Sequence, residues 1–156
     1  MFEKIQYDDA TGKMFWLHSN NRRIRVGDPV GSVRADGYIE IGYDGKKYLA
    51  HQIAWAKHHK TLPTLMIDHI NGNRSDNRIA NLREATKSIN AHNQKRAKRN
   101  NKVGLLGVSL EKKSGRYISQ INIDGKRVWG GRFDNAEQAH FAYLERKRVL
   151  HPACTI

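Results

Sequence analysis

The chain has 156 residues, and its 28 Lys and Arg against 15 Asp and Glu give a formal net charge of +13. Such a length holds one ordinary domain or two small ones, and such a charge favours a polyanionic partner, with nucleic acid ahead of an anionic membrane. No stretch approaches the ~18 uninterrupted apolar residues of a membrane span, and residues 1–6 contain no apolar signal segment. The single cysteine, Cys154, excludes an internal disulfide and a cysteine-based zinc site. We therefore expect a cytoplasmic protein that binds a polyanion.

The excess positive charge is concentrated in one short segment. Residues 1–94 contain 14 basic and 10 acidic side chains, a net of +4, and residues 103–156 contain 9 and 5, again +4. Residues 95–102 contain five basic side chains and no acidic one. We interpret 95–102 as a linker that follows a phosphate backbone; the alternative is an ordinary solvated linker or helix end. Four of its basic side chains are Lys95, Arg96, Lys98 and Arg99.

Residues 1–48 have the pattern of β-hairpins. Segments 5–7 and 13–17 flank a loop of turn-forming residues. Two Asp-Gly pairs follow, at 36–37 and 44–45. Each pair suits a type I′ turn, in which both central residues have positive φ.

The middle of the chain has the pattern of helix, strand, loop, strand and helix. The predicted elements are a helix over 49–59, a strand from 65 that runs into Asp68-His69, a polar loop over 71–77, a strand over 81–85 and a helix over 86–96. Thr86 is the expected N-cap of the second helix. This order predicts a compact ββα core at about 65–94.

The last third predicts a three-stranded antiparallel sheet covered by one helix. The strands are expected over 105–110, 117–123 and 127–133. The helix is expected to begin with Asp134 as N-cap and Glu137 at the capping-box position. Its predicted inner face comprises Ala139, Ala142, Tyr143 and Val149. The whole chain is therefore expected to belong to the α+β class.

The pair Asp68-His69 is the main candidate for a catalytic site in the sequence. A histidine at a strand end is a usable general base near neutral pH. Carboxylate and amide oxygens are hard ligands that suit Mg²⁺, and a ββα fold brings the Asp of a strand near an Asn of the helix. On chemistry alone, the alternative is a structural histidine within a hydrogen-bonded, Asn-rich loop.

The sequence around this pair resembles the HNH homing-endonuclease family, in its phage- and intron-encoded branch without structural zinc. The resemblance covers about residues 1–94 and rests on the Asp-His-x-Asn-Gly-Asn block at 68–73 together with Asn-Leu-Arg at 81–83. It implies a metal-dependent endonuclease with one Mg²⁺ or Mn²⁺ in each active site, acting on double-stranded DNA.

The same resemblance implies a role for each motif position. His69 is the general base, Asp68 is a metal ligand, and Asn81 braces the loop and orients the base through hydrogen bonds. For the second metal ligand, on the helix, we select Asn90, with His92 and Asn93 as the alternatives. The motif is then His-Asn-Asn instead of His-Asn-His.

Residues 104–151 resemble a second family, the Apetala-two or ethylene-response-factor DNA-binding domain of plants. The most specific part is Gly-x-Phe-Asp-x-Ala-Glu-x-Ala at 131–139. The resemblance implies a sheet that lies in the major groove with the helix packed behind it. Ser109 and Asn122 stand where that family usually has arginines.

Strand alternation selects the DNA-facing side chains of this sheet independently. Arg, Gln and Asn are the side chains that recognise guanine and adenine edges. The predicted base-reading residues are Gln120, Asn122, Arg127 and Trp129, with Arg116 and Arg132 as phosphate partners. The alternative is an ordinary solvated polar face.

These observations together predict a homing-type DNA endonuclease. Its parts are a nuclease domain over 1–94, with hairpins over 1–48, then the basic linker over 95–102 and a DNA-binding domain over 103–156. One metal site per chain favours a nicking monomer, although a dimer would cut both strands. The combination suggests a phage or mobile element in its host cell. The alternatives are a DNA-binding protein derived from a nuclease, without catalysis, and a small RNA-binding module.

Overall fold

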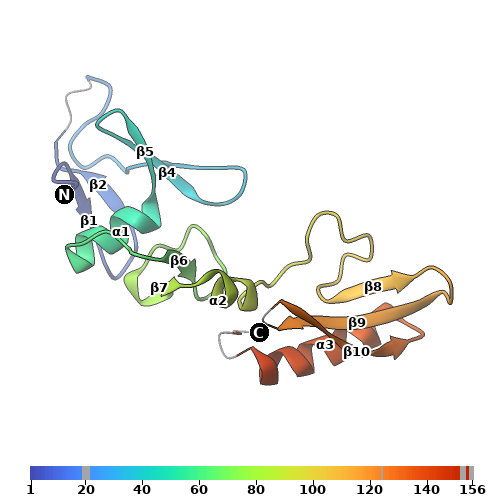
Figure 1. Cartoon of the computed structure of the whole chain (residues 1–156). Helices are drawn as coiled ribbons and strands as arrows, with labels where there is room; N and C mark the ends of the chain where they lie inside the picture. The colour runs from blue at the N-terminus through green and yellow to red at the C-terminus, as the bar shows by residue number, and fades with distance from the viewer. Residues whose placement is uncertain (19–21, 124, 152–153, 155–156) are drawn as a thin grey trace. The chain divides into compact units, whose positions relative to one another are not determined.

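The computed structural model describes residues 1–18, 22–123, 125–151 and 154. The chain forms two compact units, Met1–Thr86 and Lys87–Ile156. Figure 1 shows several small sheets in the first and one sheet beside helices in the second. All strand pairs are antiparallel, which confirms the mixed α+β class at this level. Residues 124, 152, 153, 155 and 156 of the predicted DNA-binding domain lie outside the described residues.

The first unit begins with two small sheets. One pairs β1 with β2, and the other has the order β3-β4-β5. The strands are β1 (Ile5–Tyr7), β2 (Met14–Trp16), β3 (Ser32–Val33), β4 (Ile39–Tyr43) and β5 (Lys46–Leu49). The hairpins therefore occupy the region in which the sequence predicts them.

The two Asp-Gly pairs form different turns. Asp44 and Gly45 have φ of 48° and 73°, so both residues are left-handed, as a type I′ turn requires. Gly37 has positive φ, but Asp36 does not. Arg34 instead accepts a hydrogen bond from Gly37 N–H and donates one to the Tyr38 carbonyl, which makes a three-residue loop. The type I′ prediction is wrong at 36–37 because the loop holds one residue more.

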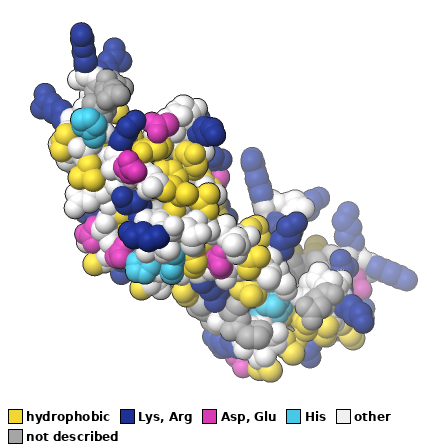
Figure 2. All heavy atoms as spheres, turned by 60° about the vertical axis from the view of Figure 1, so that its left-hand side comes forward, with side chains coloured by type: hydrophobic (Ala, Val, Ile, Leu, Met, Phe, Trp, Pro, Cys, Tyr) yellow, Lys and Arg dark blue, Asp and Glu magenta, His cyan; other side chains and the backbone are white. Residues whose placement is uncertain are grey.

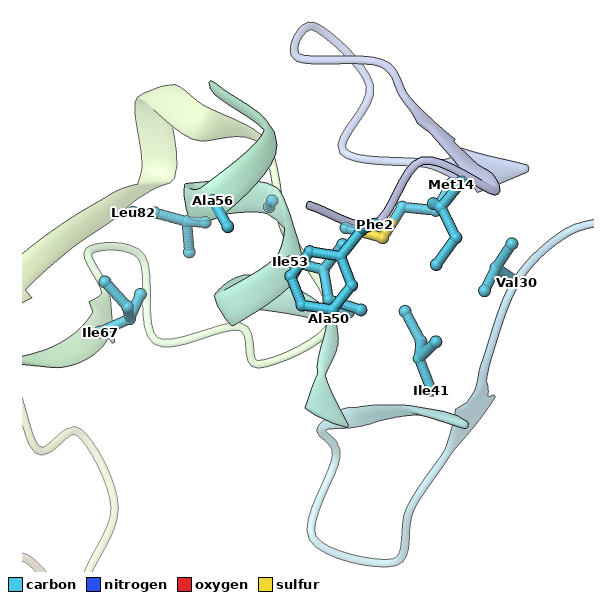
Figure 3. Close-up of a cluster of buried hydrophobic side chains, with 11 residues drawn as sticks. Phe2, Met14, Val30, Ile41, Ala50, Ile53, Ala56, Ile67 and Leu82 are labelled. Carbon is cyan, nitrogen blue, oxygen red and sulfur yellow. The ribbon is translucent and has the colours of Figure 1, made fainter. Parts of the chain in front are cut away.

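The rest of the first unit comprises α1 (Ala50–His59), β6 (Met66–His69), the 3₁₀ turn η1 (Ile79–Asn81) and β7 (Leu82–Ala85). Helix α1 lies at the centre of the hydrophobic core, where Ile53 and Ala54 are fully buried. In Figure 3, Met14, Val30 and Ile41 approach α1 from the hairpins, and Ile67 and Leu82 lie on the side of β6 and β7. The core thus joins the hairpins to the β6–β7 pair.

The second unit comprises α2 (Lys87–His92), β8 (Val108–Glu111), β9 (Arg116–Ile123), β10 (Lys126–Phe133) and α3 (Ala136–Leu150). The sheet order is β10-β9-β8. Helix α2 ends four residues before the predicted end at 96, and no regular element covers residues 95–102. The three predicted strands and the long helix are present.

Helix α3 corrects two predictions. Asn135 is its N-cap and accepts a hydrogen bond from Gln138 N–H at 2.8 Å, so Asp134 and Glu137 do not form the predicted capping box. Val149, predicted on the inner face, is 81% exposed, whereas Lys147 is 1% exposed. The buried face is the stripe Ala139, Tyr143 and Lys147, spaced four residues apart. None of the helices within the described ranges is long and apolar enough to cross a membrane.

Candidate functional site

His69 is the last residue of β6 and is almost completely buried. Its side chain is 3% exposed, and its pairing partner across the ladder is Leu82. Burial lowers the pKa of His69 below its ordinary value, although the hydrogen bond to Asn77 and nearby Asp68 oppose the shift. A buried, neutral imidazole can accept a proton at neutral pH, as a general base must.

Asp68 lies opposite Arg83 in the same ladder. Both Nε and Nη2 of Arg83 donate to Asp68 Oδ2, at 3.0 and 2.8 Å. The Asp68 carboxylate is 5% exposed, and a buried charge of this kind requires a paired partner. Arg83 therefore holds the carboxylate in one orientation within β6.

Asn81 closes the loop that connects β6 to β7. Its Oδ1 accepts from Asn71 N–H at 2.9 Å, and its Nδ2 donates to the Asp76 carbonyl at 2.8 Å. One side chain thus ties the two ends of the loop together. This geometry agrees with a bracing residue.

A second asparagine, Asn77, contacts the histidine directly. Its Oδ1 lies 3.2 Å from His69 Nε2, and its side chain is 1% exposed. Asn77 is not among the site residues predicted from the sequence, although it lies in the Asp-Asn-Arg segment at 76–78 within the motif region. No local pattern distinguishes it from the other asparagines of the loop.

Two rings pack around His69. The His51 ring meets it edge-to-face, with centroids 5.1 Å apart, and Tyr38 lies 5.4 Å from His51 and 5.9 Å from His69. Burial, followed by the neighbouring His69, lowers the pKa of His51 to about 4. His51 therefore packs against His69 as a ring that stays neutral at neutral pH.

The loop also carries fixed charges. Arg74 places its guanidinium 4.8 Å from the centre of the Tyr38 ring and donates to the Asp36 carbonyl at 2.9 Å. The Arg78 side chain, together with Asn71, lowers the pKa of Asp76 to about 2. The Arg74 contacts hold the loop against the β3–β4 turn of the same unit, and the Asp76 contacts lie within the loop.

The predicted metal ligands are hard oxygen donors on different elements. Asp68 is in β6, and Asn90 is an exposed residue of α2, the first helix of the second unit. The other candidates on α2 have other contacts: the His92 ring stacks on His151 with centroids 3.9 Å apart, and Asn93 is 6% exposed. The described residues contain no cluster of three or more His, Cys, Asp or Glu side chains. A carboxylate oxygen and an amide oxygen are donors of the kind that Mg²⁺ prefers.

The sheet of the second unit brings the predicted DNA-facing side chains together. Arg127 pairs with Asn122 and Trp129 pairs with Gln120 across β9 and β10, so all four share one face. Trp129 is 60% exposed. Ser119 and Ile121, which alternate with them along β9, are buried, as expected for the face that packs on α3.

A β-bulge brings Arg132 to this face. The register shifts between Trp129 and Gly131, so Arg132 pairs with Ile118 and its guanidinium lies 6.0 Å from the Trp129 ring. Both predicted phosphate partners form ion pairs at the surface, Arg132 with Glu111 and Arg116 with Asp134, each at 2.9 Å.

The basic stretch 95–102 is attached to the second unit at both ends. Lys147 donates to the Gln94 carbonyl, and Asn101 donates to the carbonyls of Leu105 and Val108. Between these points Arg96, Lys98 and Arg99 are exposed and Lys95 is half-buried. Figure 2 shows Lys and Arg side chains projecting from the visible surface, as the net charge leads one to expect.

Comparison with known proteins gives a family match for the region that contains the first site. Residues 48–92 match the model of the HNH endonuclease family. This range starts in β5 and ends with α2, and it contains His51, Asp68, His69, Asn81 and Asn90. The match ends at residue 92, so the resemblance of 104–151 to the ethylene-response-factor domain remains a prediction.

A solved structure described as DNA binding and cleavage by the HNH homing endonuclease I-HmuI is also similar. It is 27% identical, with a TM-score of 0.43, and the match covers 59% of this chain and 52% of that one. The chain thus spans about half the length of the solved chain. No curated protein gives a significant match.

The buried His51 predicts a pH-dependent stability. An unfolded histidine has a pKa of about 6.5, so between about pH 4 and pH 6.5 the unfolded chain binds more protons at this residue than the folded chain. Folded-state stability is therefore lost as the pH falls through 6.5. We expect a loss on the order of 2 kcal/mol through His51 between pH 7 and pH 5. His51→Phe should remove this part of the loss, as measured by urea denaturation at both pH values.

His18→Phe, which replaces an exposed histidine, controls for the change of residue type. If wild type and His51→Phe lose stability equally between pH 7 and pH 5, His51 is not held neutral by burial.

Proposed function

We propose that the protein is a metal-dependent DNA endonuclease of the homing type, which makes site-directed nicks in duplex DNA. The observation that carries this proposal is the buried His69 beside Asp68, within the region that matches the HNH endonuclease family. The neutral ring supports a role as general base. The substrate class follows from the excess positive charge and from the predicted DNA-facing sheet.

In the proposed reaction, His69 accepts a proton from the water that attacks the phosphodiester. Asn81 keeps the loop closed around the base, and Arg83 keeps the Asp68 carboxylate in place. Asp68 and Asn90 are proposed to hold one Mg²⁺ or Mn²⁺, in keeping with the divalent ion that HNH nucleases generally use. When bound, the ion neutralises charge on the phosphate and on the leaving oxygen.

The second unit is proposed to position the cut. Gln120, Asn122, Arg127 and Trp129 form one face with both amide and guanidinium donors, which suits base edges in the major groove. Arg116 and Arg132 are the proposed phosphate partners, and their ion pairs with Asp134 and Glu111 must open for that purpose. Lys95, Arg96, Lys98 and Arg99 extend the positive charge along the backbone.

The proposed activity can be tested by plasmid cleavage. Supercoiled plasmid that carries the flanking DNA of the gene should be converted to the nicked form by the full chain with Mg²⁺ or Mn²⁺, because both ions suit the Asp-Asn donor set. Excess EDTA should stop the conversion. Agarose gels over time measure it.

Intact plasmid with both ions, at protein concentrations that shift the same DNA on a native gel, would contradict the proposal. It would favour a DNA-binding protein without catalysis. Stronger competition by duplex RNA than by duplex DNA would favour an RNA-binding module.

The proposed DNA-binding face of the β8–β10 sheet can be tested by substitution. Arg127→Ala and Trp129→Ala should each weaken DNA binding by about 10-fold, because a good base contact contributes about 1–3 kcal/mol. Fluorescence anisotropy with labelled target DNA measures the affinity. Arg148→Ala and Phe141→Ala, exposed positions of α3, are the matched controls and should change it by less than about twofold. Equal losses in all four variants would mean that the face has no special role.

A further inference from the structure

The ring of His69 needs a fixed orientation to work as a base, and Asn77 is the residue placed to provide it. Asn77 Oδ1 is 3.2 Å from His69 Nε2, and both side chains are buried. The Asn77 amide has one acceptor and one donor end. Its Nδ2 donates to the Ser75 carbonyl at 3.2 Å, which leaves the oxygen as the end that faces the histidine.

An amide oxygen only accepts hydrogen bonds, so the ring nitrogen opposite it must carry a hydrogen. For a neutral imidazole this gives Nε2–H, and the lone pair is then on Nδ1. The nitrogen that accepts a proton is therefore determined by Asn77.

We infer that Asn77 is the positioning residue for His69, selecting the tautomer with Nε2–H and leaving Nδ1 as the basic nitrogen. The inference rests on the proposed function for its catalytic meaning. It assigns to Asn77 the orientation of the base that the family resemblance implies for Asn81.

The main chain of Asn77 is itself fixed by the N-terminal hairpin. Tyr7 Oη donates to the Asn77 carbonyl at 2.8 Å. Gly12, in the β1–β2 turn, has φ of 71° and packs so closely that a Cβ there would lie 2.6 Å from the Asn77 carbonyl carbon and 2.4 Å from Arg78 N. Any larger residue would displace this part of the loop. The hairpin thus supports the contact between Asn77 and His69.

The direct test is the tautomer of His69 in the full chain. Two-bond ¹H–¹⁵N correlation spectra distinguish Nε2–H from Nδ1–H, with assignment by loss of the signal in His69→Ala. Wild type should show Nε2–H. Asn77→Leu, which is of similar size but has no acceptor, should show a mixture of both forms. A wild-type spectrum with Nδ1–H overturns the inference without any variant having to fold.

The kinetic test uses three variants in single-turnover cleavage. Asn77→Leu should lower the rate on the order of 100-fold, since a misplaced catalytic group costs about that much, while DNA affinity stays within about twofold. Asn77→Asp keeps an acceptor oxygen and should recover most of the rate at about pH 8, where the imidazole is neutral. Asn73→Ala is the control, because Asn73 accepts from Ser75 in the same loop; it should cleave within about threefold of wild type.

The outcomes distinguish the positioning role of Asn77 from the proposed endonuclease function. If wild type cleaves and His69→Ala does not, an unchanged rate in Asn77→Leu overturns the positioning role and leaves the proposed function intact. Equal losses in Asn77→Leu and Asn73→Ala also overturn it, because the loop would then act as a whole. If wild type does not cleave, the proposed function fails, and the tautomer spectrum still decides whether Asn77 fixes the ring.

Discussion

The site depends on a loop that is held by asparagine side chains instead of by a sheet. Between β6 and β7 the backbone leaves the ladder immediately after His69, so its polar groups need other partners. Asn81 joins the ends of this loop, and Asn77 reaches back to the imidazole. Because His69 and Asn77 are both buried, the hydrogen bond between them is made away from water, where losing a partner costs more than at the surface. The position of the His69 ring, the proposed base, therefore depends on the conformation of this loop.

Burial also determines the charge state of the site. It lowers the pKa of both His69 and His51, so two neighbouring rings stay neutral and pack edge-to-face. The same burial would penalise the Asp68 carboxylate, and Arg83 offsets this with two hydrogen bonds to one oxygen. A neutral imidazole thus lies next to a paired carboxylate, which suits the roles of base and metal ligand proposed for these two residues.

Local signals in the sequence predicted much of the fold. The hairpins, α1, the strand-loop-strand-helix order around Asp68-His69 and the last sheet with its helix lie where patterning and turn residues predict them. Contacts between distant segments could not be predicted from local patterns. Asn77 is buried because Tyr7 and Gly12, some 65–70 residues earlier, pack on it, and the ring of Tyr38 comes from the β3–β4 turn.

The wrong predictions at the helix ends had local causes. Asn135, and not the neighbouring Asp134, is the N-cap of α3. The buried residues of α3 recur every four positions from Ala139, so Lys147 is buried and Val149 is exposed.

Whether His69 acts as the base is best decided by measuring cleavage and DNA binding side by side. His69→Ala and His58→Ala, a control at the exposed end of α1 that contacts Asp9, would be compared with wild type on the same target DNA. We expect His69→Ala to lower the single-turnover rate by at least about 100-fold, to keep its DNA affinity within about twofold and to unfold cooperatively, while His58→Ala should cleave like wild type. Undiminished cleavage by a folded His69→Ala protein would show that His69 is not the base.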